Sequence, residues 1–159
     1  MGKIIFLVQH GEALDKKENP LRPLSNMGRE TILRMGDFLV SQGSKIDVVW
    51  HSPKLRAKET AEILSTCLKL DTNSLCEYKE LEPEEPVKKT VKLIQNAKEQ
   101  NIMIVGHLPH LSRLGGLLLT GDENQELIAF EKGSIVCLDY QDTGVCALRW
   151  FIIPSLLVS

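Results

Sequence analysis

The chain has 159 residues, of which 43% are hydrophobic and 25% are charged, and its formal net charge is -2. These values suit one compact domain with its own apolar core, so we expect a single domain over residues 1–159. General nucleic-acid-binding proteins usually carry a basic excess, and its absence here excludes that class of partner. Residues 1–8 do not resemble a secretory signal, and no apolar run approaches the roughly 18 residues that span a bilayer. We therefore expect a cytoplasmic protein with no membrane partner.

The first part of the chain alternates buried strands with helices. A continuous apolar run predicts a strand buried on both faces at residues 3–8. Ser25 is a suitable N-cap, and apolar residues at helical spacing then predict a helix to about Ser41. Residues 46–50 predict a second short strand. Ser52 and Pro53 resemble an N-cap and a first helical position, so a helix is expected from there to about Leu70.

The second part continues the alternation and ends in a hairpin. Residues 76–86 are acidic and contain proline, which favours a loop, and residues 87–100 predict an amphipathic helix. A third buried strand is expected at residues 102–105, a helix at 109–119, and a hairpin of strands at 133–140 and 145–153. This order predicts an α/β fold, a three-layer α/β/α sandwich with a mostly parallel central sheet.

Three of the four histidines lie just past the ends of predicted strands. Because open parallel sheets bind ligands beyond the carboxyl ends of their strands, His10, His51 and His107 are candidates for one site. A histidine that attacks phosphorus needs one free ring nitrogen, and it needs cations around the phosphoryl oxygens. Gly11 allows substrate to approach closely, and Arg56, in the first turn of its helix, is a candidate cation. The alternatives are that Arg56 pairs with a nearby glutamate, Glu59 or Glu62, and that His107 caps a helix.

Four motifs in these regions resemble those of the histidine phosphatase superfamily. The run L-V-Q-H-G-E-A at residues 7–13 resembles its R-H-G motif, and H-S-P-K-L-R-A-K-E-T-A at residues 51–61 resembles its S-P-x-x-R-A-x-x-T-A helix start. The run G-H-L-P at residues 106–109 resembles its second-histidine motif. The run R-P-L-S at residues 22–25, with Gly28, looks like a segment of the small phosphohistidine phosphatases of the SixA type.

The resemblance implies a histidine phosphatase-like domain and a two-step hydrolysis through a phosphorylated His10. The implied substrate is phosphohistidine on a protein, for example a histidine phosphotransfer domain of a signal-transduction system, with inorganic phosphate as product. No cofactor and no metal ion is implied, and no H-E-x-x-H or C-x-x-C pattern indicates a metal site. The implied catalytic residues are His10, Arg56 and His107, and the implied substrate-binding residues are Gln9, Gly11 and Arg22.

Gln9 departs from the family pattern, which has arginine before the nucleophile. Losing a charged contact costs about 1.5 to 3 kcal/mol, or about tenfold to hundredfold in rate if it is felt fully in the transition state. Arg22 could partly compensate. The substitution also leaves open a phosphate-binding pseudoenzyme that recognises a phosphorylated partner without turning it over.

The leaving group bears on the choice of substrate. A phosphomonoester releases a poor alkoxide and needs an acid, for which Glu80 is the nearest candidate proton donor. Glu80 could equally belong to a solvated acidic loop. Phosphohistidine is a more labile phosphoramidate, and a small domain without a lid admits a protein side chain. Both points favour phosphohistidine over small phosphorylated metabolites, which remain the alternative substrates.

Overall fold

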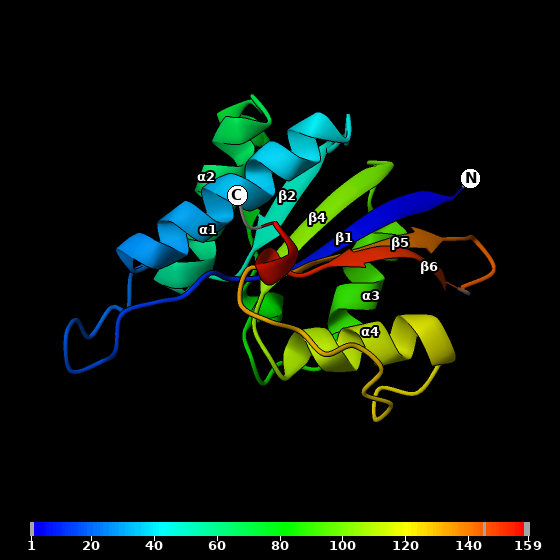
Figure 1. Cartoon of the computed structure of the whole chain (residues 1–159). Coiled ribbons are helices and arrows are strands. Elements are labelled where there is room, and N and C mark those ends of the chain that lie inside the picture. The colour runs from blue at the N-terminus through cyan, green and yellow to red at the C-terminus, as the bar shows by residue number, and fades with distance from the viewer. Residues whose placement is uncertain (1, 145, 158–159) are drawn as a thin grey trace.

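The computed structural model describes residues 2–144 and 146–157 of the chain. A six-stranded sheet lies between two layers of helices (Figure 1). The helices are α1 (Asn26–Ser41) and α2 (Leu55–Cys67) on one face, and α3 (Val87–Asn96) and α4 (His110–Thr120) on the other. The strands are β1 (Lys3–Gln9), β2 (Val48–His51), β3 (Leu75–Glu77), β4 (Asn101–Gly106), β5 (Ile135–Tyr140) and β6 (Cys146–Ile152). Short 3-10 turns are η1 (Thr72–Ser74), η2 (Lys79–Leu81) and η3 (Pro154–Leu156).

The strand order is β3-β2-β4-β1-β5-β6. The first four strands in this order are parallel, whereas β5 runs antiparallel to β1 and β6 antiparallel to β5. Gln9 of β1 pairs with Gly106 of β4, and His51 of β2 pairs with Val105. The carboxyl ends of β2, β4 and β1 therefore lie side by side at one level. This arrangement confirms the predicted α/β/α sandwich with a mostly parallel sheet.

The central strand β1 shows why the apolar run before the first histidine is continuous. Ile5 and Leu7 pack into the cluster under α3 and α4, while Phe6 and Val8 pack into the cluster under α1 and α2. Because successive side chains of a strand point to opposite faces and both faces are covered by helices, every position must be apolar. The end of β1 is thus held firmly where the polar site begins.

Local signals predicted the first helix well. The Ser25 hydroxyl accepts a hydrogen bond from the Gly28 amide at 3.0 Å and caps α1, as expected. The helix ends at Ser41, and Gly43 follows it with a positive φ of 64°. A glycine adopts this left-handed conformation without steric cost, which is why it can end the helix.

Several predicted boundaries were wrong. β3 begins just before the expected loop and continues into it, because pairing with β2 makes a strand of only three residues. α2 begins at Leu55, and its N-cap Lys54 makes no side-chain hydrogen bond, so the predicted cap at Ser52 is not used. α3 ends at Asn96, where the backbone of Ala97 becomes extended, and the carbonyls of Ala97 and Glu99 accept hydrogen bonds from the ammonium group of Lys3, each at 2.7 Å. Val145, the expected first residue of the last strand, lies outside the described residues.

Among the described residues, none of the helices combines the length and the apolar character needed to cross a membrane.

Candidate active site

His10 follows β1 and is only 6% exposed. Its Nδ1 lies 2.7 Å from the carbonyl oxygen of Gly11. Because a carbonyl only accepts hydrogen bonds, Nδ1 carries the ring proton and Nε2 keeps its lone pair. Burial is the largest of the causes that lower the pKa of this imidazole from 6.5 to about 4, and the positive charges of Arg56, Lys132 and Arg22 act in the same direction. At neutral pH the ring is therefore uncharged and has one unprotonated nitrogen.

Helices α1 and α2 both contact the turn after His10. The Gly11 amide donates a hydrogen bond to the Thr60 hydroxyl at 3.0 Å, and that hydroxyl donates to the Arg56 carbonyl oxygen at 2.8 Å. A Cβ added at Gly28 of α1 would lie 2.1 Å from the carbonyl oxygen of Glu12, so this close approach requires glycine. These contacts tie His10 to α1 and α2.

His107 follows β4, and its ring centroid lies 5.0 Å from that of His10. Its Nε2 lies 2.8 Å from the hydroxyl oxygen of Ser52, which also accepts a hydrogen bond from the Lys54 amide at 3.3 Å. The serine hydroxyl can donate its proton to Nε2, and in that arrangement the neutral ring carries its own proton on Nδ1. Burial, followed by the neighbouring charges of His10, Arg56 and Lys54, lowers the pKa of His107 to about 3. The N-cap of α4 is Pro109, without a side-chain cap, so His107 is not a capping residue.

Arg56 lies in the first turn of α2, and burial followed by the charge of Arg22 lowers its pKa. The alternative pairing of Arg56 with a glutamate of its own helix is not present in the described part of the chain. Glu59 instead accepts a hydrogen bond from the Leu24 amide at 2.8 Å and pairs with Arg29. The guanidinium of Arg56 is therefore left for another anion.

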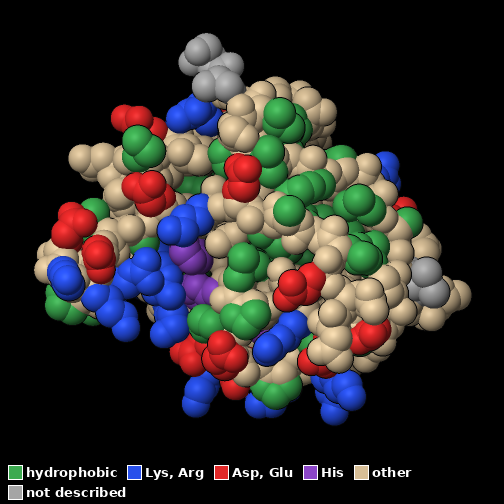
Figure 2. All heavy atoms as spheres, turned by 60° about the horizontal axis from the view of Figure 1, so that its bottom comes forward, with side chains coloured by type: hydrophobic (Ala, Val, Ile, Leu, Met, Phe, Trp, Pro, Cys, Tyr) green, Lys and Arg blue, Asp and Glu red, His purple; other side chains and the backbone are tan. Residues whose placement is uncertain are grey.

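Arg22 reaches the same place from the loop between β1 and α1. Its backbone has a positive φ of 50°, which is uncommon for a residue other than glycine, and its Nε donates to the Leu14 carbonyl oxygen at 3.0 Å. Its charge acts on both His10 and Arg56. Figure 2 shows histidine side chains in a hollow bordered by lysine and arginine side chains.

Three polar atoms of the site residues are buried with no hydrogen-bond partner among the described residues: Gln9 Oε1, Arg56 Nε and His107 Nδ1. Buried polar groups normally have partners, and two of these three are N–H donors. A glutamine amide can also rotate to present its NH2 group. The arrangement is suited to an anion with several oxygens, such as a phosphoryl group.

Glu80 is half-buried in η2, after β3. The charges that act on His10 and His107 come from basic residues and imidazoles, and Glu80 is not among them. Its role as a proton donor stays a prediction. Among the described residues, no group of three His, Cys, Asp or Glu side chains is placed to hold a metal ion.

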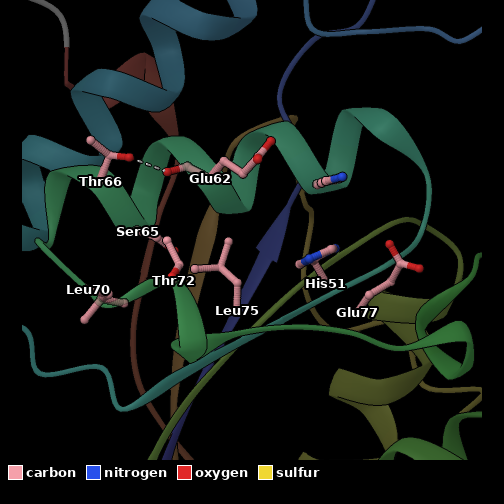
Figure 3. Close-up of a pocket in the computed structure, with 9 residues that line it drawn as sticks. His51, Glu62, Ser65, Thr66, Leu70, Thr72, Leu75 and Glu77 are labelled. Carbon is pink, nitrogen blue, oxygen red and sulfur yellow. Dashed lines mark hydrogen bonds between the residues drawn. The ribbon is translucent and has the colours of Figure 1, made fainter.

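The two other histidines have different surroundings. The Nδ1 of His51 lies 2.9 Å from the Ser52 carbonyl oxygen, and the ring lines a separate pocket of about 470 Å³ between α2 and β3 (Figure 3). His110 is fully buried in α4, and its Nε2 lies 3.1 Å from the Thr90 hydroxyl oxygen of α3. The structure thus brings together His10 and His107 but places His110 in the core.

The sequence analysis missed two residues at the site. Ser52 was assigned to a helix cap, and its contact with His107 had no local signal because the two residues meet only when β2 and β4 pair. Lys132 lies in the connection between α4 and β5, which closes on β1 where the Gly133 amide donates to the Gln9 carbonyl oxygen at 3.0 Å. Nothing near Lys132 in the sequence indicates that its charge acts on His10.

Comparisons with known proteins identify the family and the fold. The sequence profile of the histidine phosphatase superfamily (branch 1) matches residues 5–90. Phosphohistidine phosphatase SixA of Escherichia coli (strain K12) is 26% identical over 156 residues, which cover 96% of this chain and 95% of that protein. The solved structure of the protein histidine phosphatase SixA complexed with tungstate superimposes with a TM-score of 0.87 and 27% identity, over 98% of this chain and 99% of that one. The α-ribazole phosphatase of Shigella flexneri shares the fold, with a TM-score of 0.78 and 18% identity over 96% of this chain and 97% of that one.

The profile covers more than half of the chain, and the relatives of similar length align along nearly all of it. The histidine-bearing ends of β1 and β4 and the arginine of α2 stand where the motifs predicted them. This chain belongs to the histidine phosphatase superfamily (branch 1), and it is a phosphatase.

Proposed function

We propose that this phosphatase removes phosphate from phosphohistidine on a protein, through a phosphorylated His10. The observation that carries the proposal is the 2.7 Å contact between His10 Nδ1 and the Gly11 carbonyl oxygen. It leaves Nε2 as the nitrogen with a lone pair, and the lowered pKa keeps that lone pair free at neutral pH.

The proposed reaction has two displacements at phosphorus. The Nε2 lone pair of His10 forms a bond to phosphorus, the P–N bond of the substrate breaks, and its electron pair returns to the substrate imidazole, which takes a proton from solvent. Water then attacks the phosphorus of phospho-His10 and loses a proton to solvent. The P–Nε2 bond breaks, its electron pair returns to His10, and inorganic phosphate is released.

The surrounding donors stabilise the charge on the phosphoryl oxygens in both displacements. Arg56 and Arg22 supply positive charge, with Lys132 nearby, and His107 donates from Nδ1 while remaining neutral. Preorganised donors of this kind act most strongly in a site from which water is largely excluded. Gln9 and Gly11 complete the contact surface with an amide and an unhindered backbone.

The charges at the site favour phosphohistidine as the substrate. In the described part of the chain, the charged groups that shift the pKa values of His10 and His107 are arginines, lysines and histidines, and no carboxyl group that could protonate an alkoxide is among them. A phosphoramidate demands less help from an acid than a phosphomonoester does. The E. coli relative aligned along this chain is named a phosphohistidine phosphatase, and its structural counterpart binds tungstate, a tetrahedral oxyanion as phosphate is.

The test is phosphate release from a phosphorylated histidine phosphotransfer domain, with His10→Ala alongside the parent protein. We expect release by the parent and none by His10→Ala. A sample quenched in alkali during turnover should carry the mass of one phosphate on the peptide that contains His10. His110→Gln, which changes a histidine of the core, serves as the matched control and should retain turnover.

Two outcomes would contradict the proposal. If the parent hydrolyses only small phosphoesters, the protein is a phosphomonoesterase on metabolites. If it hydrolyses nothing but binds the phosphorylated domain, the replacement of the family arginine by Gln9 marks a phosphate-binding pseudoenzyme.

A further inference from the structure

A second groove of about 510 Å³ opens beside the phosphoryl site. It lies between the loop that follows β1 and the start of α2, and it shares Arg22 and Arg56 with the phosphoryl site. Its lining is four cationic side chains and four apolar ones: Lys16, Arg22, Lys54, Arg56, Pro20, Leu21, Pro53 and Leu55. The proposed reaction uses the two arginines. It gives Lys16 no role, and Lys54 acts in it only through its charge on His107.

The positive charge of the side chains that line this groove is not balanced by acidic side chains of the lining. No carboxylate lines it, and in the described part of the chain neither Lys16 nor Lys54 makes an ion pair with an acidic residue. Both lysines are exposed. The net charge of the whole chain is -2, so the basic character of this region is local. Figure 2 shows lysine and arginine side chains gathered beside the histidines.

The outer wall of the groove is preformed. The loop is closed by a hydrogen bond from the Leu14 amide to the Pro23 carbonyl oxygen at 2.8 Å. Within it, the Asn19 amide donates to the Asp15 carbonyl oxygen at 3.0 Å, and the Arg22 amide donates to the Asn19 carbonyl oxygen at 3.0 Å. These bonds hold Lys16 opposite the start of α2, so little conformational entropy is lost when a ligand enters.

The apolar wall points to a peptide rather than a lone ion. Leu21 is 70% exposed, and it lines the groove together with Leu55 and two prolines. Exposed apolar side chains among cations suit a partner that carries apolar groups together with carboxylates.

We propose that this groove binds acidic residues next to the phosphohistidine of the protein substrate, with Lys16 and Lys54 contacting their carboxylates. This inference rests on the proposed function, because it places the acidic segment relative to a phosphohistidine held at His10. Lysine–carboxylate pairs at an exposed rim act mainly on association and on the choice of partner.

The test compares two phosphohistidine peptides that differ only in having glutamates or glutamines beside the phosphohistidine. At low salt we expect the parent protein to prefer the glutamate peptide by about tenfold in kcat/KM, through a lower KM, as two exposed ion pairs predict. Added salt should reduce the preference. In the double variant Lys16→Glu/Lys54→Glu the ratio of kcat/KM should fall to one or below, whatever happens to the absolute rates.

The matched control is Lys88→Glu/Lys92→Glu. These two lysines are exposed on α3 and line a pocket with Tyr140, so the control makes the same change in net charge outside the groove. It should keep the preference of the parent protein.

Equal turnover of both peptides by the parent protein would overturn the proposed binding of acidic residues in the groove and leave the proposed function intact. Failure to hydrolyse either peptide would overturn the proposed function. Binding of the unphosphorylated peptides would then test whether the groove binds acidic residues. Tighter binding of the glutamate peptide by the parent protein than by Lys16→Glu/Lys54→Glu would support it, and equal binding would refute it.

Discussion

The hydroxyl oxygen of Ser52 lies 2.8 Å from Nε2 of His107, so the residue that follows β2 holds the imidazole that follows β4. Ser52 and His107 are both buried, and neither is free to find another partner without moving its strand end. In the part of the chain that the structure describes, Nδ1 of His107 is left without a hydrogen-bond partner.

Replacing Ser52 by alanine should lower kcat by about tenfold, because the ring loses the hydrogen bond that fixes its tautomer and orientation. Phosphate release under saturating substrate measures this effect. The matched control is Ser65→Ala in α2, which removes a buried hydroxyl that has no hydrogen-bond partner within residues 2–144 and 146–157. Rescue by Ser52→Thr would support the role of the hydroxyl, and equal activity of both alanine variants would contradict it.

The imidazoles of His10 and His107 should stay neutral well below the usual pKa of histidine. Their pKa values are lowered to about 4 and about 3, mainly by burial, so neither ring should gain a proton between about pH 8 and about pH 5. Ring C–H resonances followed by NMR against pH would measure this, with each signal assigned from its alanine variant. The unfolded chain takes up these protons near pH 6.5, so the free energy of unfolding should fall as the pH drops from 6.5 toward 4. A midpoint near 6.5 for His10 in the folded protein would contradict the buried neutral nucleophile.

Gln9→Arg should raise kcat/KM by about tenfold, because a guanidinium adds charge and paired donors where the amide of Gln9 is buried without a partner for its oxygen. The extra charge would lower the pKa of His10 further, which keeps the nucleophile neutral. Initial rates at low substrate concentration measure the gain. Gln9→Met, which has similar length and no donor, should reduce kcat/KM. A folded Gln9→Arg protein that is no faster than the parent would show that the native amide already suits its substrate.

Gly28→Ala should lower the free energy of unfolding by about 1 to 3 kcal/mol, since its Cβ would lie 2.1 Å from the Glu12 carbonyl oxygen and the backbone would have to shift. Denaturant unfolding followed by circular dichroism measures the change. Gly115→Ala in α4 is the matched control. There the nearest atom is the flexible end of Ile128 at 3.2 Å, and alanine favours a helix. Equal stability of the two variants would contradict the close approach of α1 to the turn after His10.

The parts of the fold that depend only on residues close together in the sequence were predictable. The apolar run of β1, the cap at Ser25 and the glycine after α1 each act within one element, and the structure has them as expected. β3 could not be predicted, because its three residues become a strand only by pairing with β2. Length and pattern carry no signal for so short an edge strand.

The candidate site likewise has residues that local motifs predict and residues that only tertiary contacts reveal. His10, Arg56 and His107 lie in motifs that can be recognised locally, and the ring-to-ring distance of 5.0 Å shows that the two histidines meet. The partner of His107 was missed because Ser52 in the sequence resembles a helix cap, a local role that competes with its tertiary contact. Lys132 was missed because its connection approaches β1 only in the folded chain.

The register between β1 and β4 has a consequence for how the protein acquires activity. Gln9 pairs with Gly106, and each of these residues directly precedes a histidine of the site. His10 and His107 therefore become neighbours only when β1 and β4, which are far apart in the sequence, have paired in the correct register. A slip of one residue would turn every side chain of β1 to the wrong face. Enzymatic turnover therefore reports completion of the central sheet, and its recovery during refolding would time the pairing of β1 with β4 without any added label.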